Sequence, residues 1–350
     1  MTTISVAMAT YNGARFIREQ LSSLAAQTYL PLELVVTDDG SSDETLDIIA
    51  DFSLTAPFPV HIYRNEPRLN YRANFMKCAN LCAGELIAFC DQDDIWDRDK
   101  LATLALHFAR SDVDLVFHDF RLVDTDGNPI MNMTSDLFPS SADPWSIIRG
   151  LTQAFRRKLL RYSDLWGLSV DQLNLGERLA HDQWFVFLAH SFNSLQHISQ
   201  PLLSYRQHAS NLYGVVAKSN ELETGLKGNL VAIAHAVFGQ PGLAQAKRTF
   251  LGQQFLNLGV ASIRRMKILQ EIYRRENADS ESQLPKKIEY YNNFGRSYIP
   301  RASIYRHRKM TVRLTRFFYA LKNGSYGLNE RGLKDAILDI IYGVFVSRPS

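Results

Sequence analysis

Three aspartates that directly follow an apolar run are the residues of this sequence best suited to chemistry. The run Leu86–Cys90 contains no polar residue, and the next four positions are Asp91, Gln92, Asp93 and Asp94. Carboxylates this close together repel one another, which favours protonation or a cation between them. A solvated acidic loop is the alternative interpretation. The buried strand expected before the aspartates and the helix expected after them, with Asp97 as its N-cap, favour a metal site.

A second set of polar residues follows two earlier apolar runs. Residues 4–8 lead into a loop with Thr10 and Tyr11, and residues 32–37 lead into Asp38 and Asp39. The carboxyl ends of parallel strands meet at one edge of a sheet, where ligands bind. This edge would offer the Tyr11 ring, the Asp39 carboxylate as an acceptor for a base or ribose, and the cation site. Together these groups suit a nucleoside diphosphate, whereas each alone reads as a turn or a helix-capping run.

The elements that must position these residues alternate between strand and helix. The apolar pattern predicts strands over 4–8, 32–37, 60–63 and 86–90, with helices over 14–26, after 43, and over 74–82. Further strand signals follow at 114–118, 120–123, 196–198 and 202–205. This alternation predicts an α/β fold with a mostly parallel sheet flanked by helices.

Composition bounds the class of protein. The 350 residues are 46% hydrophobic and 21% charged, which is typical of a globular protein that buries a full core. Three cysteines do not form a disulfide framework, so we expect a reducing, cytoplasmic setting. The N-terminus lacks the pattern of a signal peptide, and no apolar stretch is long enough to span a membrane.

Charge divides the chain into two regions. Residues 1–214 carry 17 Lys and Arg against 26 Asp and Glu, whereas residues 215–350 carry 22 against 10. We therefore expect two regions with different roles, 1–214 and 215–350. Residues 215–350 should form a basic, mainly helical C-terminal region with a preference for anionic partners.

Nucleotide motifs of other families are absent. The sequence contains no G-x-G-x-x-G after its first strand and no G-x-x-x-x-G-K-[ST]. Instead, residues 4–12, 34–43 and 89–101 together resemble family-2 inverting glycosyltransferases with the GT-A fold. The segment CDQDDIW is most similar to the corresponding segment of bacterial members that build surface polysaccharides, many of them rhamnosyltransferase-like. Gly150–Arg157, His181-Asp182 and Tyr205–His208 extend the resemblance, which covers about residues 2–212. The resemblance implies a catalytic domain over 1–214, with a nucleotide-sugar half at 1–123 and an acceptor half at 124–214.

The resemblance implies a role for each candidate residue. Asp182 would be the general base, and a position near a helix N-terminus would keep it ionised. Metal ligands would be Asp93, Asp91 and His208. The nucleotide would contact Thr10, Tyr11, Asp39, Arg72, Asp91 and Arg206. The acceptor would contact Trp166, His181 and Trp184, with Trp145 and Phe155 shaping its pocket.

The implied activity is inverting transfer of a sugar from a UDP- or dTDP-linked donor, with Mg²⁺ or Mn²⁺ as cofactor. The acceptor would be a glycan or a polyprenyl-diphosphate-linked sugar of surface polysaccharide synthesis. Two alternatives stay open: a nucleotidyltransferase on a similar sheet, and a non-catalytic sugar-nucleotide-binding protein of the same pathway. No recognised nucleic-acid-binding module accompanies the basic residues, so we expect no nucleic-acid partner.

The C-terminal region contains two amphipathic patterns. Met310, Leu314, Phe317, Phe318 and Leu321 fall on one helix face, flanked by basic residues that include Arg313 and Arg316. A similar pattern runs through residues 333–344. These helices would either pack on the catalytic domain or lie on an anionic membrane surface, which would place the protein peripherally on the inner face of the cell membrane.

Overall fold

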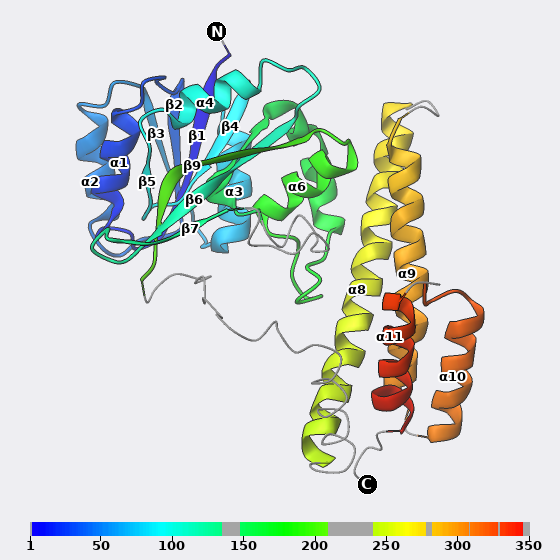
Figure 1. Cartoon of the computed structure of the whole chain (residues 1–350). Helices are drawn as coiled ribbons and strands as arrows, with labels where there is room; N and C mark the ends of the chain where they lie inside the picture. Colours follow the sequence, from blue (N-terminus) through cyan, green and yellow to red (C-terminus); the bar gives the residue numbers. More distant parts are fainter. Residues whose placement is uncertain are drawn as a thin grey trace. The chain divides into compact units, whose positions relative to one another are not determined.

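The computed structural model describes residues 2–134, 148–208, 241–277, 282–307, 309–327 and 330–345. The chain forms two compact units. One consists of Met1–Gly167 with Leu179–Val215, and the other of Leu168–Arg178 with Val216–Ser350. The first unit contains the sheet and the second is helical in its described part (Figure 1).

The first unit is built on a nine-stranded sheet with the order β3-β2-β1-β4-β8-β6-β9-β5, and β7 pairs with β6. The strands are β1 (Ile4–Thr10), β2 (Glu33–Asp38), β3 (Val60–Arg64), β4 (Leu86–Cys90), β5 (Ile95–Trp96), β6 (Leu115–Val123), β7 (Pro129–Met133), β8 (Gln153–Arg156) and β9 (Leu195–Arg206). Strands β1 to β4 are mutually parallel, as predicted, whereas β8 runs antiparallel to β4 and β6. The two pairs of short strands predicted at 114–123 and 196–205 are two long strands instead, β6 and β9.

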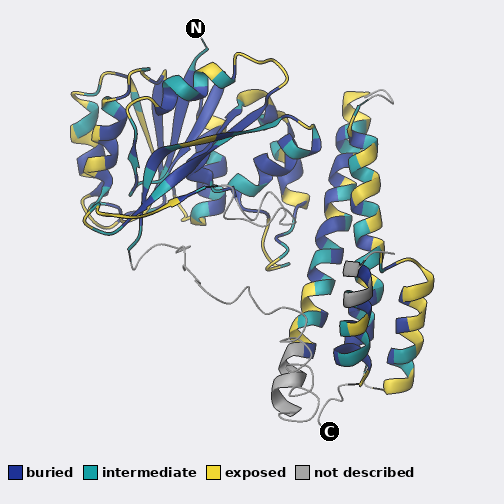
Figure 2. Ribbon diagram, viewed as in Figure 1, coloured by how far each residue is buried: buried dark blue, intermediate teal, exposed yellow. Residues whose placement is uncertain are grey.

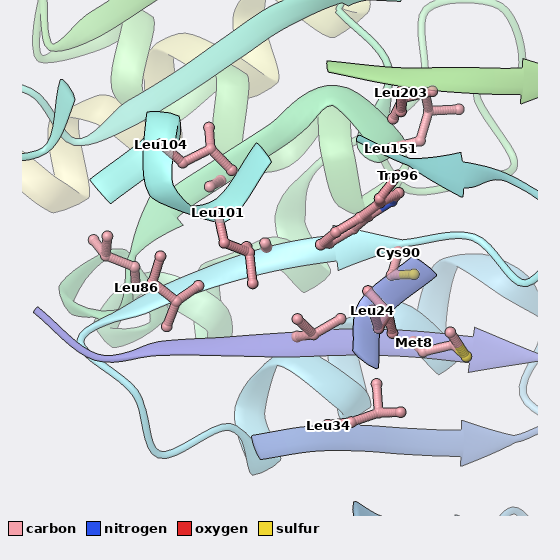
Figure 3. Packing of buried hydrophobic residues seen from close by; sticks show 14 of the residues in the cluster. Met8, Leu24, Leu34, Leu86, Cys90, Trp96, Leu101, Leu104, Leu151 and Leu203 are labelled. Atoms are coloured by element: carbon pink, nitrogen blue, oxygen red, sulfur yellow. The ribbon is translucent and has the colours of Figure 1, made fainter. Parts of the chain in front are cut away.

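Helices cover both faces of this sheet (Figure 1). They are α1 (Ile17–Ala25), α2 (Thr45–Ser53), α3 (Asn70–Leu81), α4 (Lys100–His107) and α6 (His181–Ser191). Alternate residues of β1 and β4 pack with Leu24, Leu101 and Leu104 of α1 and α4 (Figure 3). The opposite face of β4 presents Phe89 to Phe75 of α3 and Phe185 of α6. The central strands β1 and β4 are buried on both faces, which explains why they are nearly continuous apolar runs (Figure 2).

The second unit comprises α8 (Pro241–Glu276), α9 (Leu284–Arg306), α10 (Met310–Lys322), α11 (Glu330–Leu338) and a π-helical turn, η4 (Asp339–Phe345). Its core includes Ile304, Tyr305, Phe317, Tyr342 and Val344. At its centre the Asp339 carboxylate accepts hydrogen bonds from Arg301, Tyr305 and Tyr326. None of the helices in the described ranges is long and apolar enough to cross a membrane.

The predicted apolar face of α10 is only partly buried. Phe317 is 5% exposed, but Met310 is 50%, Phe318 58% and Leu321 43% exposed. Arg313, predicted to flank that face in solvent, is buried at 2% exposure. The amphipathic pattern thus predicted the helix correctly. It did not predict which side chains are buried, since Arg313 is buried whereas Met310, Phe318 and Leu321 are exposed.

Candidate active site

The predicted site residues of β1, β2 and β4 meet at one edge of the sheet. Thr10 pairs with Asp38 across β1 and β2, and Met8 pairs with Cys90 across β1 and β4. The residues that follow each strand are therefore neighbours in space. The loops that carry Tyr11, Asp39 and Asp91 start from this common edge.

Gln92, which the sequence did not single out, ties two of these loops together. Its side-chain oxygen accepts from the Tyr11 N–H at 2.9 Å, and its amide nitrogen donates to the Tyr11 carbonyl at 3.1 Å. Gly13 makes room for it, because a Cβ at that position would lie 2.3 Å from the Gln92 Oε1. The reciprocal bonds explain why a glutamine separates the first two aspartates of the acidic run.

Thr10 and Asp38 form the base of the β2 loop. The Thr10 hydroxyl, 1% exposed, donates to Asp38 Oδ2 at 2.9 Å. Asp38 Oδ1 in turn accepts from the backbone N–H groups of Gly40 and Ser41. Thr10, predicted to contact the nucleotide, therefore uses its hydroxyl to hold the loop.

Asp39 is 2% exposed and is surrounded by hydrogen-bond donors. Its Oδ1 accepts from Leu69 N at 2.6 Å and Asn65 Nδ2 at 3.1 Å. Its Oδ2 accepts from Asn70 N at 2.9 Å and from Arg68 Nε at 3.3 Å. Arg68 also lies over Tyr11, with the guanidinium carbon 3.6 Å from the ring centroid.

The carboxylates at the end of β4 lack such compensation. Burial, followed by the charges of Asp93 and Asp182, raises the pKa of Asp91. Asp94 is 0% exposed, and burial with the charges of Asp93 and Asp91 raises its pKa well above the ordinary range. Asp94 Oδ2 has no hydrogen-bond partner within the described residues. Asp182 is linked to the same strand, because its carboxylate is hydrogen-bonded to Gly150 in the turn before β8, and β8 pairs with β4.

Lys100 is a fully buried cation beside this cluster, and it was not predicted from the sequence. Its ammonium donates to the Leu151 carbonyl at 2.8 Å and lies 3.7 Å from the Trp96 ring centroid. Burial lowers the pKa of Lys100 to about 7, opposed by the negative charges of Cys90, Asp94 and Asp91. It is the first residue of α4, whose N-cap is Asp99. The predicted N-cap at Asp97 was wrong, because Ile95–Trp96 form β5 and Asp97 pairs with Arg121 instead.

His208 and Arg206 return to the acidic loop from the end of β9. His208 Nε2 lies 2.8 Å from Asp93 Oδ2, and its ring stacks on Phe16 at 4.7 Å. Arg206, predicted to contact the nucleotide, is 2% exposed and donates to the carbonyls of Asp93 and Thr125. It also pairs with Glu19. Through the bond to the Asp93 carbonyl, Arg206 holds the acidic loop in place.

The chemistry of Asp91, Asp93 and His208 fits a divalent cation that shares its ligands with a substrate. Two carboxylates and an imidazole are suitable donors for Mn²⁺ or Mg²⁺. Among the described residues, however, no three His, Cys, Asp or Glu side chains are arranged as a complete metal site. Mg²⁺ is commonly bound by one or two carboxylates plus substrate phosphates and water, so an incomplete protein set is compatible with such an ion.

Asp182 lies in the first turn of α6, as predicted. Its Oδ2 accepts from the Gly150 N–H at 3.0 Å and its Oδ1 from the Gln183 N–H at 2.8 Å. Gly150 is required for this approach, since a Cβ there would lie 2.9 Å from His181 Nε2. Two backbone N–H groups, one from Gly150 and one from the first turn of α6, thus hold the Asp182 carboxylate in a fixed orientation.

The predicted acceptor residues are buried. His181, 5% exposed, stacks on Phe75 at 4.0 Å, and burial lowers its pKa to about 4. Trp184 is 0% exposed, and Trp166 is 8% exposed with its indole N–H donating to the Leu179 carbonyl. A ring without free surface cannot stack on a sugar, so the burial of Trp184 and Trp166 contradicts their predicted acceptor contacts.

Two further predicted residues, Arg72 and Phe155, are buried. Arg72 is 8% exposed near the start of α3, and its charge contributes to lowering the pKa of His181. Phe155, predicted beside the acceptor, is fully buried and stacks on Phe185 at 3.9 Å. Trp145 lies outside the described residues.

Comparisons with known proteins agree with this geometry. The model of glycosyl transferase family 2 matches residues 5–168. The dTDP-rhamnosyl transferase RfbG of Shigella flexneri is 28% identical over 285 residues, which are 74% of this chain and 95% of RfbG. The Escherichia coli glucosyltransferase WfgD, described as acting from UDP-Glc on α-D-GlcNAc-diphosphoundecaprenol, is 28% identical over 120 residues, 34% of this chain and 46% of WfgD.

A solved structure shares the fold. TarS 1–349 of S. aureus, in complex with UDP, matches with a TM-score of 0.51 and 17% identity, covering 92% of this chain and 88% of that one. The chain spans only 60–66% of the length of other curated relatives. Residues 5–168 are therefore a family-2 glycosyltransferase domain, and the fold is the GT-A fold.

Proposed function

We propose that the protein transfers a sugar, with inversion, from a nucleotide-diphospho-sugar to the hydroxyl of a glycan or lipid-linked acceptor. The observation that carries this proposal is that the Asp182 carboxylate is hydrogen-bonded to Gly150, in the turn before β8, and that β8 pairs with β4, the strand that leads into Asp91 and Asp93. A base and a diphosphate-binding site must lie on opposite sides of the sugar that is transferred. The family-2 domain supports the same reaction class.

Asp182 is the proposed base. Its carboxylate is held by two backbone N–H groups and is only partly buried, so an acceptor hydroxyl can reach it. It would take the hydroxyl proton as the oxygen attacks the anomeric carbon. His181 is neutral across ordinary pH and packs between Phe75 and Phe89, so its proposed role is to fix the first turn of α6.

The donor would lie across the ends of β1, β2 and β4. Tyr11 and Asp39 are proposed to receive the nucleoside, and Arg72 to lie near its phosphates. A bound Mg²⁺ or Mn²⁺, held by Asp93 with Asp91 and His208, would supply positive charge beside the leaving nucleoside diphosphate. Both UDP and dTDP donors fit these groups. RfbG is named for a dTDP-linked donor, and TarS was solved with UDP.

The proposed acceptor is a lipid-diphosphate-linked glycan of surface polysaccharide synthesis, by analogy with the name of WfgD. A face of α10 supports a peripheral membrane contact. Met310, Phe318, Tyr319 and Leu321 are 43–58% exposed on this helix. Lys309, Arg316 and Lys322 are exposed beside them. Apolar and basic side chains on one exposed helix are the combination that binds anionic lipid.

A donor panel tests the function. The purified protein is incubated with Mn²⁺ and UDP- or dTDP-linked sugars, and released nucleoside diphosphate is measured with and without a lipid-diphosphate glycan. We expect release from one donor, increased by the acceptor. Binding of donors without any release, with or without acceptor, would instead favour a non-catalytic binding protein. Release of inorganic pyrophosphate in a separate incubation with a nucleoside triphosphate and a sugar 1-phosphate would favour a nucleotidyltransferase.

A further inference from the structure

Arg68 occupies the position that the proposed function assigns to the nucleobase. Its guanidinium carbon lies 3.6 Å from the centroid of the Tyr11 ring. Its Nε donates to Asp39 Oδ2 at 3.3 Å. A nucleobase bound by these two residues would make the same pair of contacts, a plane against Tyr11 and an N–H to Asp39.

The Asp39 carboxylate has no free place for another donor. A carboxylate offers about four lone-pair sites. Leu69 N and Asn65 Nδ2 occupy Oδ1, and Asn70 N and Arg68 Nε occupy Oδ2. A base can therefore reach Asp39 only if one of these donors leaves.

Arg68 is the donor that can leave at least cost. Two of the other three are backbone N–H groups at the start of α3, and Asn65 is 3% exposed and also bonded to Asn74. The Arg68 side chain is 56% exposed, and its bond to Asp39 is the longest of the four. An exposed guanidinium that moves into water keeps its charge hydrated, whereas a withdrawn backbone donor would unfold the loop.

We propose that Arg68 is an internal substitute for the nucleobase, which keeps Tyr11 and Asp39 paired in the free protein and is displaced when the donor binds. The guanidinium is planar and carries N–H groups at its edge, as a uracil or thymine ring does. Displacement must break one exposed ion pair and one cation–π contact. Arg68 therefore lowers nucleotide affinity, because its two contacts must break before the donor binds. It is also a determinant of donor specificity, because only a base that forms both contacts itself offsets the free energy lost when Arg68 leaves.

The inference rests on the proposed nucleotide site, and calorimetry with UDP and Mn²⁺ tests it in the full chain. Arg68→Ala and Arg68→Lys are compared with the wild type and with Arg98→Ala, an exposed arginine of the same unit. We expect both Arg68 variants to bind UDP about 3- to 30-fold more tightly, from the usual strengths of exposed ion pairs and cation–π contacts. Lysine keeps the charge but lacks the plane and the Nε. Arg98→Ala should match the wild type.

A second measurement reports on Arg68 directly. The Nε–H signal of Arg68 in nuclear magnetic resonance spectra, assigned by its loss in Arg68→Lys, should be protected in the free protein and exchange with water once UDP is added. If Arg68→Ala binds UDP equally or more weakly, or if the signal stays protected in the complex, the inference is wrong while the nucleotide site stands. If neither the wild type nor the variants bind UDP or dTDP, the proposed function fails and the inference with it.

Discussion

The two units bury carboxylates in opposite ways. In the C-terminal unit Asp339, 0% exposed, receives Arg301 Nε at 2.7 Å, the Tyr305 hydroxyl at 2.7 Å and the Tyr326 hydroxyl at 2.6 Å. In the N-terminal unit Asp91, Asp93 and Asp94 crowd together, and one buried oxygen of Asp94 has no hydrogen-bond partner within the described residues. A buried carboxylate with a full set of hydrogen-bond donors stabilises its fold. Crowded carboxylates with too few hydrogen-bond donors indicate a binding site for a cation and a substrate.

The largest effect should come from Asp182→Asn. An amide cannot take the acceptor proton, so we expect transfer to fall by about 10²- to 10⁴-fold. UDP binding should stay within about 2-fold, because Asp182 is proposed to contact the acceptor rather than the nucleotide, and the amide oxygen can still accept one of the two backbone N–H bonds. Product release and calorimetry measure the two quantities. Asp47→Asn, an exposed helix residue, is the control, and a parallel loss of UDP binding would remove Asp182 from the role of base.

Asp339→Ala should destabilise the C-terminal unit by about 3–5 kcal/mol, because it leaves the buried Arg301 without its main counter-charge. Native-state hydrogen exchange of the α9 amides measures this opening free energy. Asp335→Ala is the matched control. It removes the other, partly exposed partner of the same arginine, at 3.0 Å, and should cost about 1 kcal/mol or less. Equal costs for the two variants would contradict the assignment of Asp339 as the structural carboxylate.

The N-terminal unit should lose stability in mild acid through His181. Its pKa is about 4 in the folded chain, against about 6.5 when unfolded. Stability is therefore full above pH 6.5 and falls as the pH drops towards 4, by up to about 3 kcal/mol. His118, whose pKa burial also lowers, adds to the decline. Urea unfolding of wild type and His181→Asn across this range should show a shallower slope in the variant, whereas equal slopes would exclude His181.

Asp93→Ala should reduce the metal dependence of UDP binding. Losing even a supporting residue of a metal site costs about 10- to 100-fold in affinity, so loss of a ligand should cost at least 10-fold. Calorimetry with UDP, with Mn²⁺ and with chelator, gives the dependence for wild type and variant. An unchanged ratio in Asp93→Ala would place the cation elsewhere.

The smallest effect, and the sharpest contrast with Asp339, should come from Asp94→Asn. It removes a charge that neighbouring Asp93 and Asp91 disfavour, so the free energy of unfolding should stay equal or rise by about 1 kcal/mol. Because the pKa of Asp94 is raised, its own contribution to stability is most favourable at low pH and is lost as the pH rises through the folded value, opposite in sign to the contribution of His181. The gain from Asp94→Asn should therefore grow with pH in urea unfolding. A loss of stability would show that the Asp94 charge is compensated.

Much of the fold and the position of the site followed from local pattern. Apolar runs fix the strands, and parallel strands bring their ends together, so Tyr11, Asp39 and Asp91 were predictable as neighbours. Contacts between side chains that lie far apart in the sequence were not predictable. Arg206 donates to the carbonyl of Asp93, and Arg68 contacts both Tyr11 and Asp39. These contacts depend on tertiary packing, which the spacing of residues along the sequence does not reveal. The aromatic side chain of Trp184 suggested a sugar contact, but the ring is buried in the hydrophobic core instead.

Gln92 gives the site a mechanical property. Because its amide is bonded at both ends to the backbone of Tyr11, the loop that carries the carboxylates and the loop that carries the aromatic ring move as one body. A displacement at one loop is transmitted to the other without passing through the sheet. The nucleoside and the diphosphate of a donor would then be bound cooperatively, so that the affinities of the two fragments measured separately do not add up to that of the whole nucleotide.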